Sequence, residues 1–199
     1  MLVVNSQGWV IDPRIRLAIA ANVERGPMTH VHGIVVHQTD SPTAESAFNS
    51  YKRAAAMGAH FLIDKDGAIY QTASVFKQTR HVGRLKARCL LKQVCTPAEV
   101  MAYSHFNAES MYRREIRKSV PDRFPSNEDS IGIELVGEAL PRNVPEPDRV
   151  YETVTAAQNA SLKWLIASLS ATLRVAMTEV FRHPTVSYKN RTEASTAQW

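Results

Sequence analysis

The segment GIVVHQT, residues 33–39, is a short apolar run, mostly β-branched, that ends on polar side chains. Such a run predicts a buried strand. The next residues, SPTAES at 41–46, are typical of a helix start, with Ser41 as N-cap and Pro42 at the first helical position. Apolar residues then recur at helical spacing until Gly58. The stretch therefore predicts a strand, a tight turn and an amphipathic helix, with His37 near the end of the strand.

Three further segments predict strands. AHFLIDKDGAIYQTA, residues 59–73, has two extended runs joined by an Asp-Gly pair, which indicates a β-hairpin. SIGIELVGEAL, residues 130–140, predicts a strand that carries Glu134, and TEVFRH, residues 178–183, predicts a short strand that ends on His183.

Helices are expected between these strands. A capping box of Thr96 and Glu99 predicts a helix over about 97–117, and a stripe of leucine and isoleucine predicts another over about 149–174. The segment 77–95 has no clear period and is expected to be a loop. Because strands and helices interleave, we expect an α/β fold with a sheet covered by helices.

Composition sets limits on the class of protein. The chain of 199 residues is long enough for one domain with its own core, and its 44% hydrophobic and 22% charged residues are ordinary for a globular protein. The net charge of +5 favours an anionic partner such as nucleic acid, acidic lipid or a wall polymer. The acid-free stretch from Gly67 to Ala98 carries six lysines and arginines, but it lacks the interleaved aromatics of a nucleic-acid surface. We therefore expect no nucleic-acid partner.

The N-terminal segment has no cationic start followed by a sustained apolar core, so it does not predict a signal peptide. No run of about 18 apolar residues predicts a membrane span. We expect a protein made in the cytoplasm. Cys89 and Cys95 lie six positions apart, and they would form a disulfide in an oxidising compartment or stay as thiols in the cytosol. The sequence leaves both states open.

Three polar residues stand out on the predicted strands, which are otherwise apolar: His37, Glu134 and His183. Two histidines and a carboxylate match the three protein ligands of a catalytic zinc site, with the fourth position left for water. A single histidine at a strand end is more often structural, so this pattern alone does not decide between the two roles.

Five blocks of sequence resemble the zinc-dependent N-acetylmuramoyl-L-alanine amidases of the amidase-2 family. They are IVVHQTDSP (34–42), AHFLIDKDGAIYQ (59–71), RHVG (80–83), SIGIELVG (130–137) and a C-terminal histidine followed by RTE (191–193). The family includes recycling amidases, phage lysozyme-amidases and peptidoglycan recognition proteins. The blocks occur in family order. The resemblance implies a single amidase domain over 1–199, with a core of about 30–199, a central mixed β-sheet flanked by helices, and a helical insertion at about 84–125.

The same resemblance implies a set of metal ligands for one catalytic Zn²⁺. His37 and His183 match the two zinc histidines of the family. The third ligand, ten residues after the second histidine, is usually Asp or Cys, and this chain has Glu193 there. A carboxylate oxygen suits zinc, but the longer side chain would have to bind with shifted geometry.

Catalytic and substrate-binding residues are also implied. Glu134 matches the catalytic glutamate of the family. Some phage members use a tyrosine before the hairpin histidine instead, and this chain has Ala59 at that position, so Glu134 is the expected base. Arg191 occupies a position that is usually lysine, where it would stabilise the oxyanion, a role that the nearby Lys189 could share. His81 lies in RHVG, which matches a WHxG element beside the substrate groove. Residues expected to contact substrate are Gln38, His60, His81 and Lys189.

The expected function is peptidoglycan hydrolysis at the amide between N-acetylmuramic acid and L-alanine. A lytic role, as an exported effector or an endolysin, is favoured because a basic surface suits an extended anionic polymer. The enzyme would then reach the wall by export outside the Sec pathway or by lysis, with an immunity or delivery protein as a possible partner. The alternatives are a cytoplasmic muropeptide-recycling amidase and a non-catalytic peptidoglycan-binding module.

Overall fold

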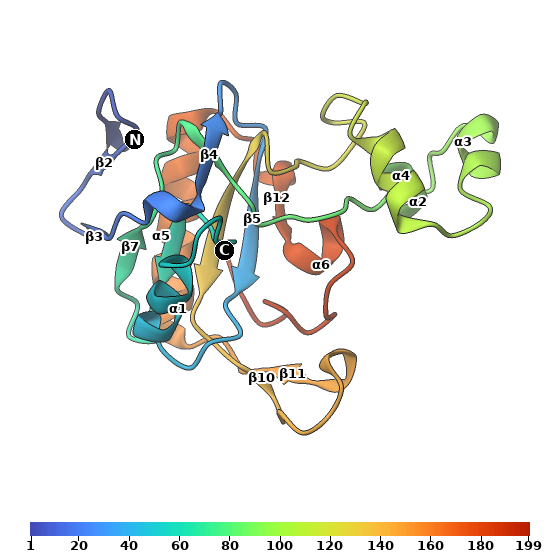
Figure 1. Cartoon of the computed structure of the whole chain (residues 1–199). Coiled ribbons are helices and arrows are strands. Elements are labelled where there is room, and N and C mark those ends of the chain that lie inside the picture. The colour runs from blue at the N-terminus through green and yellow to red at the C-terminus, as the bar shows by residue number, and fades with distance from the viewer.

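Six strands form the central sheet in a computed structural model that describes all 199 residues (Figure 1). Along β12, β5, β9 and β6 each strand pairs parallel with the next, β7 is antiparallel to β6, and β3 pairs parallel with β7. The expected mixed sheet is therefore confirmed. The sheet strands, in spatial order, are β12 (Val180–Arg182), β5 (Gly33–Gln38), β9 (Ser130–Leu135), β6 (Phe61–Ile63), β7 (Ile69–Gln71) and β3 (Ile15–Leu17).

Six α-helices and three two-stranded ribbons complete the fold. The helices are α1 (Ala44–Tyr51), α2 (Arg88–Lys92), α3 (Pro97–Ala102), α4 (Ala108–Glu115), α5 (Ala156–Leu173) and α6 (His183–Val186). The ribbons pair β1 (Val3–Val4) with β2 (Val10–Ile11), β4 (Glu24–Pro27) with β8 (Lys77–Thr79), and β10 (Ala139–Leu140) with β11 (Val150–Tyr151). None of the helices combines the length and the hydropathy needed to cross a membrane.

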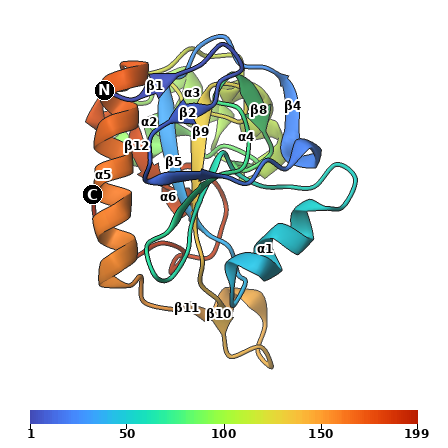
Figure 2. The same ribbon diagram turned by 90° about the vertical axis from the view of Figure 1, so that its left-hand side faces the viewer.

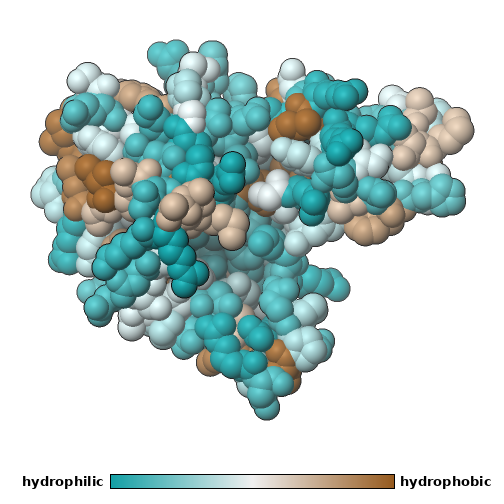
Figure 3. Space-filling model, viewed as in Figure 1, coloured by the Kyte–Doolittle hydropathy of each residue, from teal (hydrophilic) through white to brown (hydrophobic).

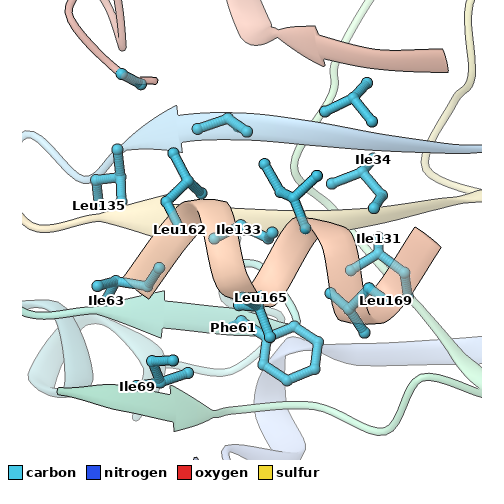
Figure 4. Close-up of a cluster of buried hydrophobic side chains, with 14 of the residues drawn as sticks. Ile34, Phe61, Ile63, Ile69, Ile131, Ile133, Leu135, Leu162, Leu165 and Leu169 are labelled. Carbon is cyan, nitrogen blue, oxygen red and sulfur yellow. The ribbon is translucent and has the colours of Figure 1, made fainter. Parts of the chain in front are cut away.

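One face of the sheet packs against α5 (Figure 4). In a strand, alternate side chains point to opposite faces. Ile34 of β5 and Ile131 and Ile133 of β9 therefore point to the same side, where they meet the buried leucines of α5 in the largest apolar cluster of the protein. The amphipathic stripe expected for this helix is confirmed.

The opposite face of the sheet carries the polar residues. His37 of β5 and Glu134 of β9 are direct partners in the parallel register, and both alternate with the residues that face α5. Helix α1 lies on this side, since its Ala44 and Ala47 pack against Leu62 (Figure 2). The strand pleat thus places the predicted histidine and glutamate next to each other.

Several predicted element bounds are wrong. The first helix is capped by Thr43, whose hydroxyl accepts from the Ser46 amide, because Ser41 forms an isolated bridge with Gly137 instead. That helix ends at Tyr51, seven residues before Gly58. The last long helix begins at Ala156, not near 149, because residues 150 and 151 pair as β11.

The region expected to hold one helix over 97–117 contains two. Helix α3 ends at Ala102, and the side chain of Asn107 caps a new helix by accepting from the Ser110 amide. The expected loop over 77–95 likewise contains strand β8 and helix α2. Side-chain caps, which depend on single residues, mark the starts of α1, α3, α4 and α5.

Helices α2, α3 and α4 form an arm, residues 88–118, that projects from the sheet (Figures 1 and 3). Cys89 and Cys95, for which the sequence left two states open, form a disulfide inside the arm. The Arg88 guanidinium joins the arm to the body, since it makes two hydrogen bonds of 2.7 Å to the Glu179 carboxylate just before β12. Both partners of this ion pair are largely buried.

Candidate active site

A polar cavity of about 520 Å³ opens beside the carboxyl ends of β5, β9 and β12. These strands are parallel, so their carboxyl ends meet at one edge of the sheet, the usual place for a ligand site in such folds. Among the titratable side chains of the lining are six that the site uses and that come from distant parts of the chain: His37, Tyr51, His81, Glu134, His183 and Glu193.

His37, His183 and Glu193 form a buried group at the base of this cavity. One ligand atom from each lies within 4.8 Å of the other two, so the group could hold a metal ion. The Nδ1 atom of His183 lies 2.8 Å from Oε1 of Glu193, and Nδ1 of His37 lies 3.5 Å from the same oxygen. The three residues that sequence reasoning assigned as ligands are thus brought together.

The charges of this group follow from its burial and its contacts. Burial and, to a smaller extent, the neighbouring His183 lower the pKa of His37 to about 4, against the opposing effect of Glu193. For Glu193, burial alone would raise the pKa, but the hydrogen bonds to His183 and His37 outweigh it and hold the value at about 2. Near neutral pH the group therefore offers a carboxylate and a neutral imidazole at His37, which is the form in which these side chains bind metals.

Hydrogen bonds on the far side of each ring fix how the ring is turned. Nε2 of His183 lies 2.8 Å from the Val82 carbonyl, which only accepts, so Nε2 carries a proton and Nδ1 is the nitrogen that faces the Glu193 carboxylate. Nε2 of His81 faces the Ser130 carbonyl at 3.3 Å and the Ser130 hydroxyl oxygen at 3.2 Å, so the proton of His81 is also on Nε2. Nδ1 of His81 must then accept from Nε2 of His37, which lies 3.0 Å away. Both His37 and His183 consequently turn Nδ1 towards Glu193, the position from which each could bind a metal ion.

The surroundings of His81 hold it in this place. A Cβ on Gly132 of β9 would lie 2.8 Å from Nδ1 of His81, so only glycine leaves room for the ring. The Asn127 side-chain oxygen accepts from the backbone amides of His81 and Val82 at 2.9 and 2.7 Å, which fixes the RHVG segment beside the sheet.

Glu134 lies in the cavity next to this group, and Tyr51 donates a hydrogen bond to its carboxylate. Burial raises the pKa of Glu134 to about 7, the Tyr51 hydrogen bond opposes the rise, and the charge of Glu193 adds to it. A carboxyl group that titrates near neutral pH suits proton transfer. Tyr51 was not predicted as a site residue, because in the sequence it appears only as one of the apolar positions of α1.

A family model for N-acetylmuramoyl-L-alanine amidase, Amidase_2, matches residues 27–196. The chain belongs to this amidase family. The predicted family and enzyme class are therefore confirmed. A comparison with curated protein sequences found no significant match.

Solved structures of other proteins share the fold. A crystal structure of an AmpD derivative has a TM-score of 0.54 at 18% identity and covers 96% of this chain and 91% of its own. The catalytic domain of XlyA has a TM-score of 0.51 at 22% identity, with 88% and 87% covered. AmpDh3 from Pseudomonas aeruginosa, in complex with anhydromuramic pentapeptide, has a TM-score of 0.52 at 17% identity, with 83% and 56% covered. At these identities the likeness shows the fold.

Two of the residues expected to contact substrate in this amidase are used inside the protein instead. His60 is fully buried and does not line the cavity, because its Nδ1 accepts from the Gly132 amide at 3.0 Å and its Nε2 donates to the Lys77 carbonyl at 2.8 Å. The expected substrate contact of His60 is wrong, since the ring has no exposed surface. Gln38 lines the cavity, but its amide donates to the Glu152 carbonyl and accepts from the Ala194 amide. Gln38 therefore braces the segment that carries Glu193.

The remaining predicted residues of this amidase are placed as follows. His81 lines the cavity, although its ring nitrogens are used by His37 and Ser130. Lys189 also lines the cavity, and Arg191 is exposed and lies outside the lining. Of the two cations considered for the oxyanion, Lys189 is the one at the cavity.

Proposed function

We propose that this amidase is a zinc-dependent peptidoglycan hydrolase that cuts the amide between N-acetylmuramic acid and the L-alanine of the stem peptide. The observation that carries the proposal is the buried group of His37, His183 and Glu193 beside Glu134 in one polar cavity.

The donor set fits zinc. Two imidazole nitrogens and one carboxylate oxygen are a common ligand set for catalytic zinc and leave a fourth position for water. The far-side hydrogen bonds of His37 and His183 occupy both Nε2 atoms and leave Nδ1 as the nitrogen of each ring that would bind the metal, and such outer contacts are general at metal sites. Bound zinc would lower the pKa of a water molecule and polarise the amide carbonyl.

Glu134 is the proposed general base and acid. With a pKa of about 7 it is present in both protonation states near neutral pH. It would accept the proton of the attacking water at its carboxylate and then deliver that proton to the nitrogen of L-alanine as the amide breaks. The Tyr51 hydroxyl, which donates to this carboxylate, would keep it oriented.

Lys189 is the proposed cation for the negative charge that develops on the carbonyl oxygen, since it lines the cavity, whereas Arg191 is exposed outside it. Sequence reasoning placed Arg191 in this role first, with Lys189 sharing it. We reverse that order.

We propose a lytic role on intact wall, reached by export or by lysis of the producing cell. The net charge of +5 supports this role, because a cationic protein concentrates on an extended anionic polymer. We also propose that residues 1–199 form one amidase domain, with the segment of about 84–125 as an insertion that carries the arm. A recycling role would instead require small soluble fragments as the substrate.

The test uses purified protein with isolated sacculi and, separately, with soluble anhydro-muropeptides, and identifies products by mass spectrometry. We expect unsubstituted glycan and peptides that begin with L-alanine, faster from sacculi, and about one zinc per chain. Glu134→Gln should lower the rate by about 10²-fold or more while zinc stays bound, and Glu45→Gln, on the exposed side of α1, should not change it. Cleavage between sugars or within the stem peptide would overturn the proposed bond, and full activity without zinc would overturn the metal. Faster cleavage of the soluble fragments would favour recycling.

A further inference from the structure

The excess positive charge of the chain lies on the arm and the segment that leads into it. Residues 84–118 contain eight lysines and arginines and three glutamates. The rest of the chain contains sixteen basic and sixteen acidic residues, so it adds nothing to the net charge of +5. A partner that recognises this protein by negative charge is therefore expected to meet it at the arm.

Three cations of the arm are free to bind such a partner. The three glutamates of the arm are all paired, either with basic residues of the arm itself or with Arg84. Lys92, Arg114 and Arg117 are exposed and enter no ion pair or side-chain hydrogen bond within the chain. Arg114 and Arg117 line a polar hollow of about 480 Å³ along α4. The charge of these three side chains is thus available at the surface.

Large apolar side chains are exposed on the same arm. They are Leu90, Leu91, Val94, Val100, Met101 and Phe106. The first three lie in the short loop that the disulfide closes, with the Cα atoms of Cys89 and Cys95 4.7 Å apart. Met101 of α3 is 75% exposed, and a carboxylate oxygen of Glu99 in the same helix lies within 4.8 Å of both sulfur atoms. The arm therefore presents apolar side chains from two neighbouring elements.

These apolar side chains are not needed for the packing of the arm. The arm has a small core of its own on the buried side of its helices, formed by Ala87, Cys89, Tyr103 and Met111. The ion pair of Arg88 with Glu179 fixes the base of the arm, which projects away from the sheet (Figure 1). Exposed apolar side chains that gather in one region mark a site of interaction.

The combination of apolar and cationic side chains indicates the chemistry of the partner. An anionic membrane offers acyl chains to protruding leucines and phosphates to arginine and lysine. A wall polymer offers the negative charge but no apolar phase. Leu90 and Leu91 line neither of the two polar hollows of the arm, so they protrude and do not form a groove that would receive a helix of another protein.

We propose that the arm docks on an anionic lipid membrane, with the leucines of the disulfide loop among the acyl chains and Lys92, Arg114 and Arg117 at the headgroup phosphates. This interaction goes beyond the amidase reaction, because it holds the enzyme at the membrane that lies next to the wall. It uses no residue of the active-site cavity.

The experiment mixes the whole protein with vesicles of phosphatidylglycerol and phosphatidylethanolamine, or of phosphatidylcholine alone, and measures the bound fraction by sedimentation. We expect binding to the anionic vesicles to be about tenfold tighter or more, and to weaken at raised salt. Leu90→Ser combined with Leu91→Ser should weaken binding about tenfold or more, because two apolar side chains lose their burial. Arg114→Gln combined with Arg117→Gln should have a similar effect, since each cation near an anionic surface strengthens binding about fivefold.

Matched controls lie outside the arm. Val3→Ser removes an exposed apolar side chain and Arg53→Gln an exposed charge, and both variants should bind vesicles like the wild type. Circular dichroism checks that each variant is folded. Met101→Ser replaces the leucine pair if that double variant is unfolded.

Equal binding to both kinds of vesicle, or binding that does not depend on the exposed apolar side chains, would overturn the proposal. Binding to soluble polyglutamate but not to vesicles would overturn it in favour of an acidic protein. Cleavage of soluble muropeptides should be the same in the leucine variant and the wild type. Absence of cleavage by the wild type would refute the proposed function, and the vesicle measurements would still decide the role of the arm.

Discussion

Replacing His81 by leucine is expected to weaken zinc binding without removing any ligand. In the wild type, Nδ1 of His81 accepts the Nε2 proton of His37 at 3.0 Å, inside a site where His81 is only 8% exposed. Leucine cannot accept this hydrogen bond, and water has little access to replace it. The buried N–H of His37 would then lose its partner, or the ring would change tautomer and withdraw the Nδ1 lone pair from the metal.

The size of the effect follows from the cost of that lost contact. A buried donor without a partner costs about 1–3 kcal/mol, and loss of an outer contact to a metal ligand typically weakens metal affinity about 10–100-fold. We therefore expect the zinc Kd to rise about 10–100-fold in His81→Leu. His81→Asn should stay within about threefold of the wild type, because its side-chain oxygen can take the place of Nδ1 as acceptor.

Zinc affinity is measured by competition with a chromophoric chelator, and the His37 tautomer by nitrogen NMR of the zinc-free protein. His105→Asn is the matched control, since His105 is exposed on the arm. Circular dichroism checks that each variant is folded. The reasoning is refuted if His81→Leu binds zinc within twofold of the wild type, or if the asparagine variant is no better than the leucine variant.

Three other predictions follow from buried polar contacts. Tyr51→Phe removes the hydrogen bond that lowers the pKa of Glu134, so that pKa should rise and the acidic limb of kcat/KM against pH should move to higher pH; an unmoved or lowered limb contradicts the assignment of Glu134 as base. Arg88→Met leaves the Glu179 carboxylate without its partner beneath the arm and should lower the free energy of unfolding by about 3–5 kcal/mol in urea denaturation, with a loss below 1 kcal/mol as the contrary result. Burial lowers the pKa of His60 to about 4, so between pH 6.5 and 4 the unfolded chain binds a proton that the native state does not, and stability should fall as pH falls; the slope of unfolding free energy against pH should be shallower in His60→Gln, and an equal slope would refute this.

The strands of the site could be predicted because each depends on local sequence. GIVVHQT and SIGIELV are short apolar runs, and the Asp-Gly hairpin over 59–73 forms β6 and β7 as expected. The helix bounds could not be predicted as well, since Thr43 and Asn107 compete as caps with other polar residues nearby. Which residue caps the helix depends on the segment that packs beside it. Ser41, for example, forms a bridge with Gly137 and does not cap the helix.

Within the site, the family blocks indicated His37, His183, Glu193 and Glu134, and all four line one cavity. The partners of these residues could not be read from the sequence. Tyr51 meets Glu134 across 83 positions of the chain. His60 lies within one of the matching blocks, but the tight contacts between the sheet and the 77–83 segment turn its ring into the interior. Sequence indicated the candidate side chains, and packing decided which of them are accessible.

His37 and Glu134 are direct partners in the parallel register, so the distance between them is kept as long as β5 and β9 stay paired. The two residues are neighbours through the backbone of β5 and β9, which are both interior strands of the sheet, and such strands open only when much of the protein unfolds. A partly unfolded chain with an open arm or open edge ribbons would therefore still hold this pair in place. Loops around the cavity can diverge in length and composition while the spacing between the two side chains is kept by the sheet.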